Sequence, residues 1–122
     1  MHPFPQKADL AFLLKGEPIL QSLAVWPYGL TIGFDNDCSI NVANAVSYVS
    51  AAGETRKYEA EWRNEQPILF HVLLEQKLAN VERSDLELAL VFESGGRLIV
   101  HSDLSMYEAG QIYGPAGSMS VF

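Results

Sequence analysis

The sequence is poor in cysteine, in basic residues and in long apolar runs. Its single cysteine, Cys38, cannot form an internal disulfide and fits a reducing compartment. Only 8 Lys and Arg stand against 15 Asp and Glu, a formal net charge of −7, so nucleic acids and anionic membranes are unfavourable partners. No apolar run approaches the roughly 20 residues that span a bilayer, and the N-terminus lacks the basic and apolar regions of a secretory signal. These absences predict a soluble, cytoplasmic protein.

The length and composition predict a single globular domain over residues 1–122. Hydrophobic residues make up 48% of the chain and charged residues 19%, which is too apolar for a disordered protein. We divide the domain into an N-terminal segment (1–18), a first β unit (19–62), a helix (64–76) and a second β unit (77–122).

Most of the chain has the period-2 alternation of antiparallel strands. Leu30, Ile32 and Phe34 alternate with smaller residues and lead into the turn signal Asp35-Asn36-Asp37. The turn Glu93-Ser94-Gly95-Gly96 separates a similar pair of runs in the second unit. Strands are expected at 19–26, 30–34, 39–43, 46–49, 56–62, 78–82, 86–92, 98–100, 107–113 and 118–122.

Two segments favour helix. Ala8 to Lys15 predicts a short N-terminal helix that ends at Gly16. Residues 64–76 begin with a capping Asn64 and a first-turn Pro67, and continue with apolar residues at helical spacing. The predicted fold class is therefore α+β: a mainly antiparallel β-sheet with one central helix that covers a face and a short N-terminal helix.

The two β units align as half-repeats. When Phe34 is aligned with Phe92, Ile40 falls on Leu98 and Val42 on Val100, and the two turns coincide. Two unrelated hairpins with period-2 patterns would also align in this way. The alignment leaves open whether the units are a duplication.

The chain shows no motif for a metal, a cofactor or catalysis. Metal sites need histidines and carboxylates at short spacing, which the three histidines do not have: His2, His71 and His101. Acidic neighbours raise the pKa of Cys38, and no serine lies in a Gly-x-Ser-x-Gly turn. Glu59 and Glu61 lie on one strand face, whereas paired catalytic carboxylates usually face each other across a cleft. We therefore expect no cofactor, no metal, no catalytic residues and no enzymatic activity.

Acidic residues gather at places that also carry aromatics. Aspartates flank the first turn, and glutamates alternate with a tyrosine and a tryptophan after residue 57. Long-range attraction accelerates encounter with a basic partner, and aromatic anchors hold the complex. The candidate partner-binding residues are Asp35, Asp37, Tyr58, Glu59, Glu61, Trp62 and Glu65, with Tyr107 and Glu108 as a second choice. If Tyr58 and Trp62 face the core, the acids on the opposite face remain the candidates.

The second half carries a hairpin from Leu88 to Val100 and a further element from Tyr107 to Pro115. These two elements resemble a family of small bacterial proteins of unassigned function that are associated, as immunity proteins, with polymorphic toxins and contact-dependent growth inhibition. Gly110 stands where that family often has tryptophan. The resemblance implies a cytoplasmic, non-enzymatic inhibitor of one cognate toxin.

The functional hypothesis is therefore an immunity protein that covers the active site or substrate groove of a toxin, expected to be a basic nuclease. An acidic surface can occupy a groove built for phosphates. One alternative is a structural adaptor that forms homo-oligomers through its sheet edges. Another is a β-domain that binds a small ligand in a pocket.

Overall fold

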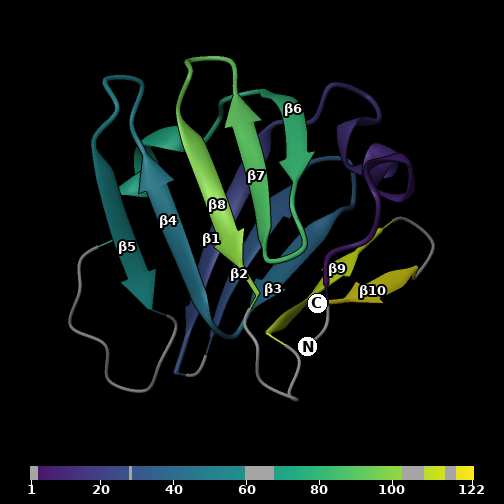
Figure 1. The fold of residues 1–122 in the computed structure, drawn as a ribbon. Coiled ribbons are helices and arrows are strands. Elements are labelled where there is room, and N and C mark those ends of the chain that lie inside the picture. Colours follow the sequence, from purple (N-terminus) through teal and green to yellow (C-terminus); the bar gives the residue numbers. More distant parts are fainter. Residues whose placement is uncertain (1–2, 28, 60–67, 103–108, 115–117) are drawn as a thin grey trace.

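A computed structural model describes residues 3–27, 29–59, 68–102, 109–114 and 118–122. Its strands form two antiparallel five-stranded sheets, with the orders β1-β2-β3-β9-β10 and β5-β4-β8-β7-β6 (Figure 1). The strands are β1 (Leu20–Trp26), β2 (Gly29–Phe34), β3 (Ser39–Val42), β4 (Ala45–Val49), β5 (Thr55–Glu59), β6 (Leu78–Arg83), β7 (Glu87–Phe92), β8 (Arg97–His101), β9 (Gly110–Tyr113) and β10 (Met119–Val121). The predicted mainly antiparallel β character is confirmed, with two sheets where one was expected. Residues 60–62 and 107–108 of two expected strands lie outside the described residues.

The two sheets lie one behind the other and enclose one apolar core. Along β2 every second residue is buried, from Leu30 to Phe34, and β7 repeats this pattern from Leu88 to Phe92. The residues between them face outward and are only partly covered. This alternation places one face of each sheet in the core and leaves the other as an outer face.

The pairing of strands repeats between the two sheets. Leu20 pairs with Phe34, and the equivalent residue Leu78 pairs with Phe92; a β-bulge follows the first pair in each case. The next hairpins repeat as well, because Ile32 pairs with Ile40 where Leu90 pairs with Leu98. The three strands β1-β2-β3 therefore have the same register as β6-β7-β8.

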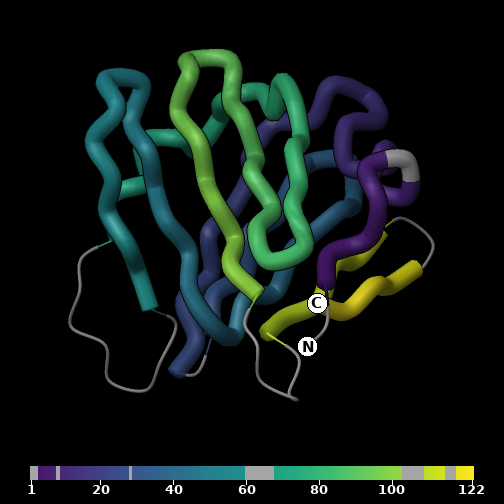
Figure 2. Tube along the Cα trace, viewed as in Figure 1, coloured from purple at the N-terminus to yellow at the C-terminus, as the bar shows by residue number. Residues whose placement is uncertain are grey.

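The fourth and fifth strands of each half belong to the other half's sheet. Hairpin β4–β5 adds to β8, and hairpin β9–β10 adds to β3 (Figure 2). The two hairpins correspond in their pairing, since Tyr48 of β4 pairs with Leu98 where Ile112 of β9 pairs with the equivalent Ile40. Each sheet is thus built from both halves of the chain.

The central helix expected over 64–76 is wrong for the residues that the structure describes. In its place is the 3-10 turn η2 (Phe70–Leu73), while residues 64–67 lie outside the described part. Phe70 and Leu73 are buried and Val72 is exposed, so the apolar residues that meet the core are three apart, as a 3-10 turn requires. The N-terminal helix is also of the 3-10 type, η1 (Lys7–Leu14). No helix in the described ranges is long and apolar enough to cross a membrane.

Gly110 lies where two chain segments approach closely. A Cβ atom built on it would collide with the backbone oxygen of Asn41 and with the ring of Phe122. There is therefore no room at this position for the tryptophan that the family named in the sequence analysis often has.

Candidate functional site

Five exposed carboxylates lie in the turns next to the point where the two halves meet. Ile19 and Lys77 form an antiparallel bridge there. The Ile19 N–H donates to Asp35 Oδ1 at 2.9 Å, and the Lys77 N–H donates to Glu93 Oε1 at 3.4 Å. We call this surface the acidic pole. Its members are Glu17, Asp35, Asp37, Glu75 and Glu93.

Two lysines lie among the turns of the acidic pole: Lys77, and Lys15, whose backbone oxygen accepts a hydrogen bond from Asn36. The ammonium group of Lys77 lies 2.9 Å from Glu17 Oε1 and lowers the pKa of that carboxyl group. Glu17 and Glu75 occupy equivalent positions in the two halves, and both have positive φ angles, 53° and 70°. The two glutamates therefore lie on matching backbone bends, and the predicted residues Asp35 and Asp37 lie in the turn from which Asp35 bonds the Ile19 N–H.

The structure separates the other predicted residues from the pole. Tyr58 is 6% exposed and packs edge-on against Phe70, at 6.1 Å between ring centroids, so it belongs to the core rather than to a partner-binding surface. Glu59 is exposed on the opposite face of the edge strand β5, 3.8 Å from Lys57 Nζ. The remaining candidates lie outside the described residues: Glu61, Trp62, Glu65, Tyr107 and Glu108.

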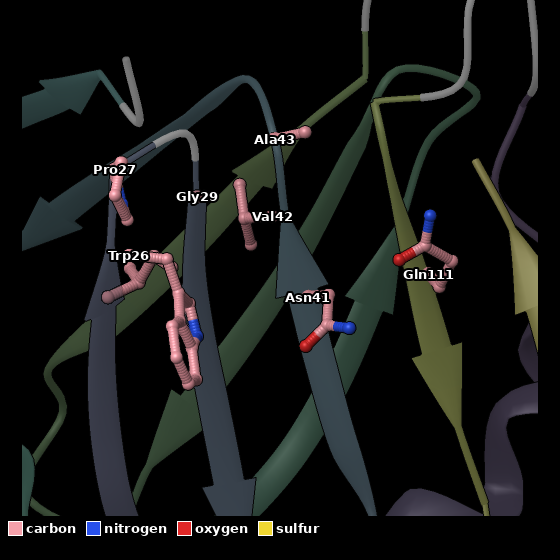
Figure 3. Close-up of a pocket in the computed structure, with 8 residues that line it drawn as sticks. Trp26, Pro27, Gly29, Asn41, Val42, Ala43 and Gln111 are labelled. Atoms are coloured by element: carbon pink, nitrogen blue, oxygen red, sulfur yellow. The ribbon is translucent and has the colours of Figure 1, made fainter. Parts of the chain in front are cut away.

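A hollow of about 330 Å³ lies on the outer face of the first sheet, where β1 turns into β2. Figure 3 shows the indole of Trp26 and the amides of Asn41 and Gln111 in a row across the strands. We call it the Trp26 hollow. The described residues that line it carry no charge: Trp26, Pro27, Gly29, Leu30, Asn41, Val42, Ala43 and Gln111.

Hydrogen bonds hold the indole of Trp26 in place. Its Nε1–H donates to Thr31 Oγ1 at 2.9 Å, and the Thr31 hydroxyl donates to Asn41 Oδ1 at 2.8 Å. The register explains this chain, because Thr31 pairs with Asn41, which pairs with Gln111 on the next strand. The edge of the indole is bonded, yet the side chain of Trp26 remains 59% exposed.

A second hollow, of about 230 Å³, occupies the equivalent place on the outer face of the second sheet. In the half-repeat alignment Ser84, Ala89 and Ile99 stand where the first sheet has Trp26, Thr31 and Asn41. Its lining is charged and includes Glu82 and Arg97, whose side chains approach to 3.4 Å. The two hollows therefore share a position and differ in chemistry.

Next to the second hollow, Ser47, His101 and Glu87 form a row on the outer face. Ser47 Oγ lies 2.8 Å from His101 Nε2, and His101 Nδ1 lies 3.9 Å from Glu87 Oε2. Burial lowers the pKa of His101, an effect that Glu87 opposes and Lys57 reinforces. Ser47 is 7% exposed and lies in the middle of β4, which is paired on both sides. The strand therefore directs its amides at β5 and β8 rather than at the space over Oγ, where an oxyanion hole would be needed.

Within the described ranges no three His, Cys, Asp or Glu side chains are grouped to hold a metal ion. Cys38 is buried in the first turn with its sulfur 3.8 Å from the backbone oxygen of Phe12, and burial, aided by Asp37, raises its thiol pKa. A raised pKa reduces the thiolate fraction at neutral pH, which makes this sulfur a poor nucleophile.

Sequence reasoning missed the Trp26 hollow. A signal was present: Thr31 and Asn41 are polar where the aligned positions of the second half, Ala89 and Ile99, are apolar. The half-repeat is recognised by its core positions, whereas this difference lies at outward ones.

Comparison with family models places residues 20–122 in a family of unknown function (DUF6188). Searches among curated proteins and among solved structures gave no match.

Proposed function

We propose that this chain, which belongs to the DUF6188 family of unknown function, is a cytoplasmic immunity protein that binds and neutralises a cognate toxin. The observation that supports this proposal is the acidic pole, which places five exposed carboxylates in the turns at the junction of the halves. A basic toxin, such as a nuclease with a phosphate-binding groove, is the partner that this surface complements.

The pole is suited to fast association. Its carboxylates are exposed, and the whole chain carries a net charge of −7. The pole therefore attracts a basic partner at short range, and the net charge attracts it at long range. Such steering raises association rates by about 10- to 1,000-fold at low ionic strength. Neither catalysis nor a cofactor is part of the proposed mechanism, in which the protein acts by occupying the toxin's groove.

The test is co-purification with the product of the adjacent upstream gene, followed by a toxicity assay. A one-to-one complex that protects the host supports the proposal. The pole variant Glu17→Lys/Glu75→Lys should lower the association rate about tenfold or more. The matched control, Glu82→Lys/Glu87→Lys, changes the net charge equally on the outer face of the second sheet and should leave the rate within about twofold.

Two results contradict the proposal. One is the absence of both a complex and protection. The other is an equal loss of association rate in the pole variant and in its control, which would mean that net charge alone, and not the pole, attracts the partner.

A further inference from the structure

We propose that the Trp26 hollow binds a neutral saccharide, with one sugar ring stacked on the indole and its hydroxyl groups bonded by the amides of Asn41 and Gln111. The proposal is independent of the toxin-binding proposal. The hollow lies at the far end of β1 from the acidic pole, about 20 Å away along the strand.

The indole is already arranged for stacking. Its N–H is occupied by Thr31, whose own hydroxyl is bonded to Asn41. The ring is therefore held while the side chain stays 59% exposed. A fixed ring loses little conformational entropy when a ligand covers it, which makes binding more favourable than with a mobile side chain.

The rest of the lining is chemically complementary to the hydroxyl-bearing edge of a sugar. An amide side chain offers two N–H donors and a carbonyl acceptor, so it can bond hydroxyl groups as donor and as acceptor. Asn41 and Gln111 are paired across β3 and β9, so the row runs from the indole to Asn41 and then to Gln111 (Figure 3). An apolar ring face next to neutral polar groups matches a ligand with a C–H face and a hydroxyl rim.

The equivalent hollow in the second sheet shows that the fold does not require these residues. The same backbone register is built there with Ser84, Ala89 and Ile99. A row of indole, hydroxyl and amide groups is therefore a property of the first hollow and not of the β architecture.

Charge decides which class of ligand fits. The described lining residues of the Trp26 hollow are uncharged in a chain of net charge −7. Among these described residues, an anionic ligand would meet no cation and a basic peptide would meet no carboxylate. A volume of about 330 Å³ is at the lower end of the range for ligand pockets, which suits one or two sugar rings.

The experiment is NMR titration of the full chain with neutral tetrasaccharides of glucose, N-acetylglucosamine, xylose or mannose, up to about 10 mM to detect millimolar affinity. The Trp26 indole signal is assigned from its loss in Trp26→Phe. At least one sugar should shift this signal and receive saturation transfer. Trp26→Ala should weaken binding about tenfold or more, and Trp26→Phe should weaken it less. Because the side chain is exposed, both variants should keep the backbone spectrum of the folded protein.

The matched control is Ile99→Thr, which alters the equivalent outward position in the second sheet and should leave sugar binding unchanged. The pole variant Glu17→Lys/Glu75→Lys should also bind sugar normally, so failure of one proposal is distinguishable from failure of the other. The proposal is overturned if no sugar in the panel shifts the indole signal, or if Trp26→Ala binds as well as the natural chain. It is also overturned if an oligolysine peptide shifts the signal and the sugars do not, because the hollow would then be a protein-docking site.

Discussion

His101 is a residue whose charge is controlled by the sheet around it. It accepts or donates one hydrogen bond with Ser47 through Nε2, and burial favours its neutral form. Glu87 on the neighbouring strand favours the cation, whereas Lys57 on β5 opposes it. Since desolvation is the largest of these effects, the pKa lies below the ordinary value of 6.5.

This lowered pKa predicts a loss of stability in mild acid. The unfolded chain takes up the His101 proton before the folded chain does, so the free energy of unfolding is highest above about pH 6.5 and falls as the pH drops through the folded pKa. The substitution His101→Gln should remove this part of the pH dependence. Urea unfolding at about pH 7.5 and about pH 5.5, for the natural chain and the variant, measures the difference. An unchanged dependence in His101→Gln would contradict the assignment.

Single residues also mark how far the sequence alone could predict the sites. The turn signal correctly predicted that Asp35 and Asp37 lie in an exposed turn. Alternation placed Tyr58 on one face of its strand without indicating that this face is the core. The fixed position of the Trp26 indole follows from its contact with Thr31 on the neighbouring strand, and a cross-strand contact is set by register, which a residue pattern does not specify.

At the scale of elements, the two hairpin turns need a positive φ angle at the same position and have different residues there. Asp37 and Gly95 are equivalent in the half-repeat alignment, and both have positive φ angles, 65° and 92°. Glycine adopts this conformation without strain, whereas a residue with a Cβ atom does so at a cost that is smaller for aspartate than for most. The turn signals were readable from the sequence because Asp-Asn-Asp and Ser-Gly-Gly are typical of such bends.

Exchanging the turn residues should have effects of unequal size. Gly95→Ala should lower the free energy of unfolding by about 1 kcal/mol, because only strain is added and the new Cβ meets nothing closer than ordinary contact. Asp37→Gly should stay within about 0.5 kcal/mol of the natural chain, since relief of strain offsets the greater freedom of the unfolded state. Chemical denaturation measures both, and equal losses would show that the turns are not equivalent.

The helix was the element that the sequence mispredicted. Ile68, Leu69, Val72 and Leu73 have helical spacing, yet Leu69 and Val72 are exposed and Leu73 packs near Gly96. The chain needs only a short turn here, because β6 begins at Leu78 beside the bridge of Ile19 and Lys77. Tertiary connection outweighed a weak local preference.

For the whole molecule, the exchange of hairpins is the dominant feature. Hairpin β4–β5 completes the sheet of the second half, and β9–β10 completes that of the first. A short connection, Ala43 and Asn44, carries the chain from β3 in one sheet to β4 in the other. Strand positions were predictable from alternation, but period-2 patterns carry no information about which strand pairs with which, so this topology was not.

The exchange predicts that neither half folds alone as a monomer. Residues 1–63, produced separately, lack β9 and β8, which pair with the second edges of β3 and β4, and should show no cooperative unfolding at low concentration. Coexpression with residues 64–122 should restore a soluble, cooperatively folding complex. Two copies of the first fragment can reproduce the exchange between themselves, which would give a concentration-dependent transition. A sharp transition independent of concentration in the isolated fragment would contradict the prediction.

The same exchange determines how long a strand waits for its partner during biosynthesis. The free edge of β3, which ends at Val42, waits for β9, which begins only at Gly110. At a translation rate of about 5 to 20 residues per second the wait lasts roughly 3 to 14 s. During that interval a strand edge that will be internal in the finished protein is open to neighbouring nascent chains, and the second edge of β4 waits in the same way for β8, which begins at Arg97. The speed of the ribosome over the second half of the message therefore bears directly on the yield of native protein.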